Sequence, residues 1–378
     1  MRPKTMKYFD QLGTNSFNEF ESLVSSGKKI VGIYCEFSPR ELILAADAVP
    51  ICLCGYSHDQ ITPAETILPS MLCPLIKSSF GYVVTESCPF FITSEFVIAE
   101  TTCDGKKKMY EILQYQKPMF VLELPQKPDE YEAFKHWFSE VQKLKNYMEE
   151  KLQVKITDDK LRESIRFMNE ERKILKELQE CMRTDPVPMS GYDMSLVFGR
   201  VVDRQVYMSH VKELLDELRD MISRGELTDT KGAKRILLTG CPTGLGADKV
   251  IKLTEECGAV IVCRESCTGM KSVDLNVDDN KPPLEAIAER YFKLPCSCMT
   301  PNKGRLELLD RMIEEFSVDG VIDLTWEACH TYNIESYLVA RHLKDKYNMP
   351  MLHVETDYSD SDTAQLRTRI EAFLDILE

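Results

Sequence analysis

The sequence VDGVIDLTWEACHTYNIES at residues 318–336 decides the fold class of this chain. Its part Gly320–Trp326 is a short, mostly apolar run, which is typical of a strand buried on both faces of a parallel sheet. The run ends shortly before Cys329, so a thiol follows the carboxyl end of the strand. Ligand sites in open α/β sheets form at that edge. The segment therefore predicts a parallel sheet with a cysteine at its functional edge.

The same alternation extends through residues 231–378, which we interpret as a C-terminal α/β domain. Predicted strands are Arg235–Cys241, Ala259–Glu265 and Met351–Thr356, and predicted helices are Lys303–Phe316 and Asp362–Leu377. Arg235–Cys241 has the same pattern as Gly320–Trp326, because it too is an apolar run typical of a buried strand and it ends at a cysteine.

Residues 1–150 are predicted to form an N-terminal α/β domain of the same kind. Its predicted strands are Lys29–Cys35, Ile51–Gly55, Phe96–Thr101 and Met119–Leu124, with helices that begin at Pro39 and span Gly105–Gln114. Strands that alternate with helices predict a doubly wound parallel sheet.

Residues 151–230 are predicted to be a helical connecting module. Apolar residues recur there at helical spacing, Asp158 and Asp159 stand where an N-cap is expected, and PVPMSGYD at 186–193 separates two helices. The expected fold is therefore two doubly wound, Rossmann-like domains joined by a helical module.

Composition narrows the class of function. The net charge of −14 over 378 residues argues against nucleic-acid binding. No run of about 18 apolar residues and no signal-type N-terminus is present, so we expect a cytoplasmic protein without a membrane segment. Disulfides are rare in a reducing cytoplasm, so the 14 cysteines indicate metal binding, catalysis or simple burial.

The positions of the cysteines favour metal binding. Cys35, Cys103, Cys241 and Cys329 each lie at or just beyond the carboxyl end of a predicted strand. Others lie in turn-like contexts: Cys73, Cys88, Cys267, Cys296 and Cys298. Four are interpreted as structural: Cys52, Cys181, Cys257 and Cys263. Paired CxxC motifs and a CxxCxxC run are both missing from the sequence, so a metal cluster has to be assembled from distant loops.

Several segments together resemble a known superfamily over nearly the whole chain. They are YCEFSPRELILAADAVP at 34–50, LCPLIKSSFG at 72–81, AETTCDGKKKMYE at 99–111, TGCPTG at 239–244, VDGVIDLTWEACHTYNIES at 318–336 and HVETDYS at 353–359. They resemble the 2-hydroxyacyl-CoA dehydratase and benzoyl-CoA reductase superfamily. The additional cysteines make the chain most similar to the branch of double-cubane cluster proteins.

The resemblance implies an iron–sulfur cluster in the cleft between the two α/β domains. Its dehydratase pattern of three cysteines per 4Fe–4S cluster matches Cys73, Cys103 and Cys329. The double-cubane branch implies an 8Fe–9S unit with a second set of three. We favour Cys241, Cys267 and one of Cys296 and Cys298 for it, and Cys35 and Cys88 stay open alternatives.

The resemblance also implies partners: an ATP-hydrolysing activator protein with its own 4Fe–4S cluster, a small-molecule substrate and a second copy of the chain in a homodimer. The chain has no GxxxxGK[ST] motif, so we expect it to bind no nucleotide itself. TGCPTGLGADK at 239–249 is interpreted as a tight turn that presents Cys241 in preference to an anion cradle.

Reduction coupled to proton transfer requires an acid near the cluster. His330 beside Cys329 is the first candidate, followed by Glu36 and Glu327, and Lys77 is expected to pair with an acidic neighbour or a substrate anion. Two enzymatic functions remain open: an ATP-dependent reductase of small molecules, and a subunit of a 2-hydroxyacyl-CoA dehydratase with a single 4Fe–4S cluster. A third hypothesis is a redox-inert scaffold.

Overall fold

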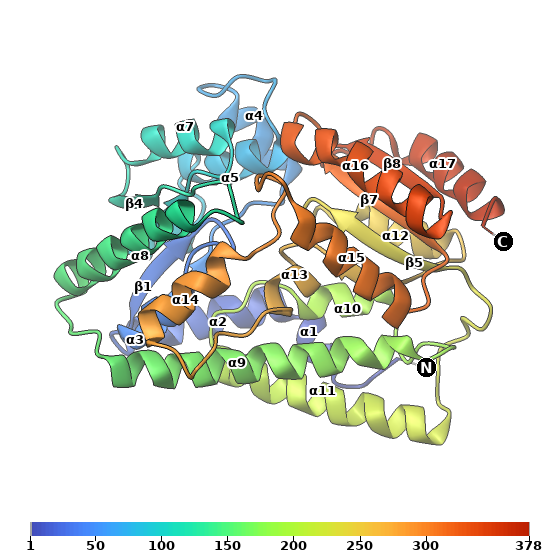
Figure 1. The fold of residues 1–378 in the computed structure, drawn as a ribbon, viewed down its shortest axis with the longest axis horizontal. Helices are drawn as coiled ribbons and strands as arrows, with labels where there is room; N and C mark the ends of the chain where they lie inside the picture. The colour runs from blue at the N-terminus through green and yellow to red at the C-terminus, as the bar shows by residue number, and fades with distance from the viewer. Residues whose placement is uncertain (1, 378) are drawn as a thin grey trace.

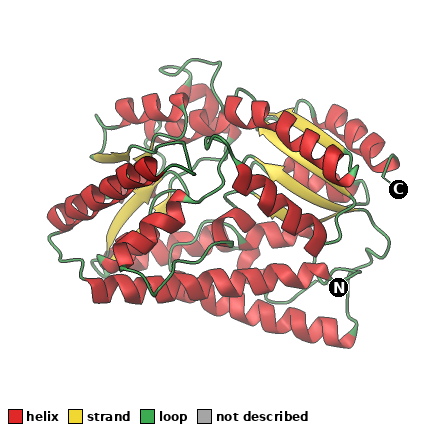
Figure 2. Ribbon diagram, viewed as in Figure 1, coloured by secondary structure: helices red, strands yellow, loops and turns green. Residues whose placement is uncertain are grey.

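The computed structural model describes residues 2–377 and contains two parallel sheets of four strands each (Figures 1 and 2). The first has the order β2-β1-β3-β4, with β1 Lys29–Ile33, β2 Ala48–Cys52, β3 Phe96–Glu100 and β4 Met119–Leu122. The second has the order β6-β5-β7-β8, with β5 Arg235–Gly240, β6 Val260–Glu265, β7 Gly320–Trp326 and β8 Met351–Thr356. Because the two orders correspond strand by strand, the predicted pair of doubly wound sheets is confirmed.

One predicted strand is wrong in its position. The second strand is Ala48–Cys52, and the predicted Ile51–Gly55 begins three residues too late. Pro50 lies inside the strand, opposite Val31 of β1. Proline is tolerated there because β2 is an edge strand, which needs no N–H donor on its outer side.

Helices surround both sheets. Those of the first half are α1 Met6–Asp10, α2 Leu12–Ser25, α3 Arg40–Ala45, α4 Ile61–Ala64, α5 Pro74–Val84, α6 Pro89–Thr93 and α7 Asp104–Leu113, with a 3-10 turn at His58–Gln60. Those of the second half are α12 Lys249–Glu256, α13 Met270–Val273, α14 Pro283–Phe292, α15 Lys303–Glu315, α16 His330–Tyr347 and α17 Thr363–Asp375. In residues 2–377 no helix combines the length and the apolar character needed to cross a membrane.

Four helices lie between the two halves in sequence: α8 Tyr131–Leu152, α9 Asp158–Glu180, α10 Gly191–Val197 and α11 Arg204–Arg224. A 3-10 turn at Cys181–Arg183 extends α9. The N-cap of α9 is Thr157, whose hydroxyl accepts from Lys160 N, so Asp158 and Asp159 occupy the first turn. There they favour the positive end of the helix dipole. In Figure 1, α9 and α11 run side by side beneath both halves.

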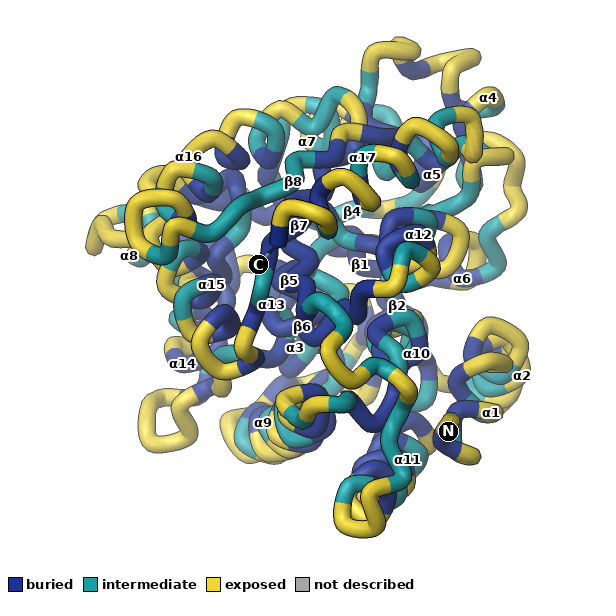
Figure 3. The backbone as a smooth tube through the Cα atoms, turned by 90° about the vertical axis from the view of Figure 1, so that its right-hand side faces the viewer, coloured by how far each residue is buried: buried dark blue, intermediate teal, exposed yellow. Residues whose placement is uncertain are grey.

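The strands divide the core between their two faces. Successive residues of a strand point to opposite sides, so Ile30 and Val31 of β1 enter different clusters. The cluster that contains Ile30 also takes Leu238 of β5 and Ile322 of β7, so one face of each sheet contributes to a common core. Figure 3 shows β5, β6 and β7 of the second sheet as buried, whereas the edge strand β8 is mostly intermediate. This shared core holds the carboxyl ends of both sheets in a fixed relation.

The segment of the chain that follows β6 crosses from the second half to the first and joins the two halves more tightly; we call it the excursion. After β6 the chain leaves the second sheet, and α14 packs on α8 and α9 beside the first sheet. The indole Nε1 of Trp137 donates to the carbonyl oxygen of Ala288 at 2.9 Å. The hydroxyl of Tyr291 accepts from Arg40 N at 2.9 Å and donates to Glu41 Oε2 at 2.7 Å. The chain returns through Cys296 and Cys298, which lie near charged groups of both halves: Lys271 and Glu335 for Cys296, and Cys35 and Glu100 for Cys298.

Candidate functional site

Cysteines follow the first three strands of each sheet within a few residues. The six are Cys35 after β1, Cys54 after β2, Cys103 after β3, Cys241 after β5, Cys267 after β6 and Cys329 after β7. Corresponding strands of the two sheets therefore carry a thiol at the same edge. The carboxyl edge is where open α/β sheets bind ligands.

Three of the predicted ligands stand at helix N-termini. Cys73 is the N-cap of α5, Cys103 of α7 and Cys329 of α16. Unpaired N–H groups and the helix dipole favour negative charge at such positions. They therefore favour the thiolate, which is the form that binds metal.

Cys73, Cys103, Cys241 and Cys329 form the first thiol group. The thiols of Cys241 and Cys73 both hydrogen-bond to Cys329, and these contacts hold the pKa of Cys329 well below its ordinary value. Cys241 Sγ also accepts from Trp326 N at 3.4 Å. Burial is the main reason that the pKa of Cys103 is raised, and the charge of the nearby Cys329 raises it further. The structure thus places Cys241 with Cys73 and Cys329, whereas the sequence grouped it with Cys267.

Cys35, Cys267, Cys296 and Cys298 form the second thiol group. Burial raises the pKa of Cys267 to about 12, and the charge of Cys296 adds to the effect. A hydrogen bond from the Cys298 thiol lowers the pKa of Cys296 to about 6. Burial raises the pKa of Cys35 as well, with Glu100, Cys267 and Cys296 among its charged neighbours. The two thiols of the CSC pair therefore interact directly, and one of them is favoured as the thiolate.

A buried ion pair lies between the two thiol groups. Lys106 Nζ is 3.2 Å from Glu100 Oε1 and donates to the carbonyl oxygen of Tyr34 at 3.2 Å. Its charge acts on both Cys35 and Cys103. Sequence reasoning missed this pair, although a signal exists: the strand ends in Glu100 and a lysine follows six residues later.

The second half contains the counterpart. The strand β6 ends in Glu265, and Lys271 follows at the same spacing, with Nζ 2.8 Å from Glu265 Oε1 and 2.8 Å from the Tyr332 hydroxyl. Arg305 is fully buried beside them and binds Glu265 at 3.1 Å and Glu335 at 2.5 Å. The charge of Lys271 favours the thiolate forms of Cys267 and Cys296, while carboxyl groups pair with both Lys271 and Arg305.

The predicted acids differ in their surroundings. Glu36 is buried and accepts two hydrogen bonds from Arg40, at 2.7 and 2.8 Å. It also acts on the charge of Cys267. Glu327 and His330 are exposed. The expectation that Lys77 pairs with an acidic neighbour is confirmed, because its Nζ is 2.8 Å from Glu65 Oε1.

The glycine-rich turn after β5 is explained by packing. A Cβ on Gly244 would lie 2.6 Å from the ring of Tyr56, and one on Gly246 would lie 2.5 Å from the carbonyl oxygen of the same residue. Gly240 has φ +109° and lies against the carbonyl oxygen of Leu324, so it admits no side chain. The close approach of Tyr56 and Leu324 thus accounts for the glycines and for the position of Cys241.

The donor set fits an iron–sulfur centre in its chemistry. In the described residues 2–377, no group of three or more His, Cys, Asp or Glu side chains is arranged as a site for a metal ion. A cluster holds its ligands apart by the width of its own iron–sulfur core, so the spacing required for a single ion does not apply. Both thiol groups supply soft thiolate ligands, and neither contains a histidine.

Comparison with known proteins identifies the family. Residues 35–377 match the family model described as 2-hydroxyglutaryl-CoA dehydratase, D-component. The chain is 38% identical to "Putative dehydratase subunit YjiM" of Escherichia coli (strain K12), over 99% of this chain and 98% of the relative. It is 24% identical to the (R)-phenyllactyl-CoA dehydratase beta subunit of Clostridium sporogenes, over 96% and 98% of the two chains. It is 22% identical to one of the subunits of benzoyl-CoA reductase from Thauera aromatica, over 96% and 92%. The chain therefore belongs to the 2-hydroxyglutaryl-CoA dehydratase D-component family, within the superfamily of 2-hydroxyacyl-CoA dehydratases and benzoyl-CoA reductases.

Proposed function

We propose that this protein is an iron–sulfur reductase that uses a double-cubane 8Fe–9S cluster to reduce small molecules. The observation that supports it most directly is the presence of two adjacent thiol groups at the carboxyl edges of the two sheets. A single 4Fe–4S cluster with three cysteine ligands would use only one of them. The buried Lys106–Glu100 pair lies between the groups and is near thiols of both.

The contacts suggest how the ligands divide. One cubane takes its three ligands from Cys73, Cys103, Cys241 and Cys329, and the other takes three from Cys35, Cys267, Cys296 and Cys298. In the second set the thiols of Cys296 and Cys298 interact with each other, so we propose that one of the two is the ligand and that the other hydrogen-bonds to it. Hydrogen bonds to cluster sulfur atoms raise the reduction potential.

The protein's own groups prepare the site. When bound, the cluster supplies electrons at low potential. Lys106 and Lys271 each pair with a glutamate and lie near Cys35 and Cys267, whose thiolate forms their charge favours. Among the predicted proton donors, Glu36 is buried near Cys267 and Arg40 fixes its orientation, whereas His330 and Glu327 stand at the surface. We therefore propose Glu36 as the first candidate for proton delivery, with His330 and Glu327 after it.

The electrons are proposed to come from an ATP-hydrolysing activator protein with its own 4Fe–4S cluster, and the chain is proposed to work as a cytoplasmic homodimer. ATP belongs to the activator in this scheme. This proposal is supported by the absence of a phosphate-binding motif from the sequence and by the packing role of the glycines near residue 244.

Iron and sulfide analysis after anaerobic purification tests the function. About eight irons per chain are expected from the 8Fe–9S cluster. Single replacements Cys73→Ser, Cys241→Ser, Cys267→Ser and Cys296→Ser are expected to lower the iron content, because a serine hydroxyl is a poor ligand for iron. Cys257→Ser serves as the matched control, since Cys257 lies at the end of α12 outside both thiol groups.

Each outcome has a separate meaning. A full iron content in one cysteine variant removes that residue from the ligand set. A metal-free wild-type chain, prepared under strictly anaerobic conditions with iron supplied, would contradict the whole proposal.

The second candidate function is a subunit of a 2-hydroxyacyl-CoA dehydratase with one 4Fe–4S cluster. The relatives named dehydratase subunits favour it. About four irons per chain, and activity only with a different subunit and a CoA thioester, would support this function and exclude the reductase.

A further inference from the structure

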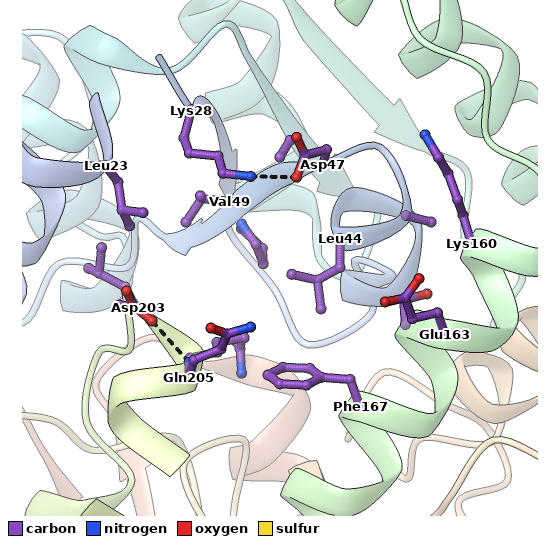
Figure 4. Close-up of a pocket in the computed structure, with 16 residues that line it drawn as sticks. Leu23, Lys28, Leu44, Asp47, Val49, Lys160, Glu163, Phe167, Asp203 and Gln205 are labelled. Atoms are coloured by element: carbon purple, nitrogen blue, oxygen red, sulfur yellow. Dashed lines mark hydrogen bonds and ion pairs between the residues drawn. The ribbon is translucent and has the colours of Figure 1, made fainter. Parts of the chain in front are cut away.

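Two cavities lie next to each other below the first sheet. The outer one has a volume of about 690 Å³ and is bordered by β2, α3, α9 and the start of α11 (Figure 4). The inner one has a volume of about 100 Å³. The same two segments form a wall of both: α9 contributes Phe167 to the outer cavity and Met168 to the inner, and the chain just before α11 contributes Val202 and Val201 in the same way.

Arg204 stands at the boundary, since it lines both cavities. It is the first residue of α11, directly after the N-cap Asp203, whose carboxylate accepts from Gln205 N and Val206 N. Figure 4 shows Asp203 and Gln205 joined at this helix end. The cap fixes the position of the Arg204 backbone, and the long side chain then spans from one cavity to the other.

The inner cavity ends at the second thiol group. Cys267, Thr268 and Glu36 all line it. Where it meets the outer cavity, Arg204 Nη1 forms an ion pair with Glu171 Oε1, and both residues line the inner cavity. The second half of that pair is unused, because Arg204 Nε and Glu171 Oε2 are buried without a hydrogen-bond partner. A buried donor and a buried acceptor left unpaired in this way cost stability unless a further molecule binds both.

We propose that the two cavities form one route by which the substrate travels from the surface to Cys267, and that the Arg204–Glu171 pair controls passage. This inference deepens the proposed function, because it takes the thiols to be the redox centre. The unused donor and acceptor of the pair bind the incoming molecule as it enters the inner cavity.

The volume of the inner cavity defines the substrate class. A cavity of about 150 Å³ accommodates benzene, and each water molecule in the liquid occupies about 30 Å³. The inner cavity, at about 100 Å³, therefore takes a molecule of a few non-hydrogen atoms, smaller than benzene. The molecule is polar, because it replaces water as a partner of both Arg204 Nε and Glu171 Oε2.

The outer cavity has a different role. Three basic side chains (Lys28, Lys160 and Arg204) and three acidic ones (Asp47, Glu163 and Asp203) border it, so it has no excess charge with which to select an anion or a cation. Lys28 and Asp47 also neutralise each other, at 2.5 Å. Selection by size and polarity therefore takes place at Arg204 and beyond it.

Alkylation of Cys267 in the metal-free full-length chain tests the route. Iodoacetamide is the small probe and fluorescein maleimide the large one, with modification followed by peptide mass spectrometry at one pH. The quantity compared is the ratio of the iodoacetamide rate to the maleimide rate at one cysteine. We expect this ratio to be at least about tenfold higher at Cys267 than at Cys181, which is buried outside the route. Equal ratios at the two cysteines would show that both react through unfolding, and would overturn the proposal.

Two variants then change the route in opposite directions. Val201→Trp fills the inner cavity and is expected to slow iodoacetamide modification of Cys267 by at least about tenfold. The double variant Glu171→Gln with Arg204→Gln shortens the side chain at the boundary without leaving a lone buried charge, and is expected to speed the modification. Cys257 at the surface end of α12 is the internal control and keeps its rate.

The outcomes separate this inference from the proposed function. Unchanged Cys267 rates in both variants, with unfolding midpoints equal to that of the wild type, would overturn the route while leaving the iron content to decide the cluster. Conversely, if the Cys267 modification rates change as expected but the chain never binds iron, the route is supported and its redox role is excluded.

Discussion

At the scale of single residues, the buried charges under the second thiol group are unevenly balanced. Lys271 and Arg305 supply two positive charges, while Glu265, Asp323 and Glu335 supply three carboxyl groups. Asp323 is the weakest partner, at 3.4 Å from Arg305 Nη2. Burial accordingly raises the pKa of Asp323 to about 6, so its protonated form restores the balance.

This balance predicts how stability depends on pH. A carboxyl whose folded pKa is raised stabilises the fold fully below its ordinary value of 3.8, and the contribution is lost as the pH rises through about 6. Asp323→Asn removes this titration. Relative to the wild type, the variant should therefore gain unfolding free energy on the order of 3 kcal/mol between pH 4 and pH 7. Urea unfolding at both pH values measures it.

A constant difference between variant and wild type across that pH range would show that Asp323 stays ionised. Asp310→Asn is a suitable control, because Asp310 on α15 is only partly buried and its hydrogen bonds with Lys346 and His342 lower its pKa. The pKa of Asp310 is held below its ordinary value of 3.8, so this carboxyl is ionised in both the folded and the unfolded chain over most of that range, and the difference between this variant and the wild type should stay nearly constant.

The cysteines illustrate what the sequence predicts at this scale. Their places after strands followed from the apolar pattern, because a strand that ends beside a thiol exposes it at the sheet edge. Which thiols meet could not be predicted. The approach of Cys241 and Cys73 to the same thiol, Cys329, depends on how the two sheets face each other, and the pairing of Lys106 with Glu100 depends on a turn whose path the sequence pattern leaves open.

At the scale of elements, strands were predicted closely and helix partners were not. Gly320–Trp326 and Met351–Thr356 match the observed β7 and β8, since buried strands have a strong apolar signal. The helix α14 has an ordinary amphipathic pattern, which shows that one face is buried but not against which sheet. It lies in the range predicted for the C-terminal domain, yet it packs on α8 beside the first sheet.

The attachment of α14 can be tested with one hydroxyl. Tyr291→Phe removes the group that accepts from Arg40 N and donates to Glu41 Oε2. Both partners are then left short of one hydrogen bond in the interior, so a loss of about 1–3 kcal/mol in unfolding free energy is expected. Denaturant unfolding measures it. Tyr115→Phe, at a side chain that is 84% exposed, should change stability by less than about 0.5 kcal/mol. Equal effects of the two substitutions would show that α14 is not held by this hydroxyl.

At the scale of the whole molecule, the two halves are organised alike. Each sheet has the same strand order, each carries cysteines after its first three strands, and each buries a glutamate–lysine pair at the site. The two thiol groups nevertheless do not follow this division. Cys73 comes from the first half and joins Cys241 and Cys329 of the second, while Cys35 joins Cys267 and Cys296. Each group is therefore shared between the halves.

Shared groups predict that metal links the halves mechanically. If the proposed cluster is present, it crosslinks both sheets, and its binding free energy adds to the stability of the folded chain. Anaerobic removal of iron with a chelator should lower the unfolding midpoint by at least about 5 °C, as is expected for a loss of a few kcal/mol in a chain of this size. Calorimetry before and after removal and reconstitution provides the measurement. An unchanged midpoint after complete iron loss would mean that the cluster does not bridge the halves.

The excursion through α14 also constrains the order in which the chain can fold during synthesis. The first sheet is translated early, but the face that receives α14 stays uncovered until residues near 290 have left the ribosome. Phe9 at the start of the chain likewise waits for Tyr207 of α11, against whose ring it packs. Neither half can close its core alone, so a nascent chain carries open apolar surface for most of its translation. This topology therefore requires that the apolar surface of the nascent chain is protected during synthesis. It also requires that the chain leaves the ribosome only when it is nearly complete.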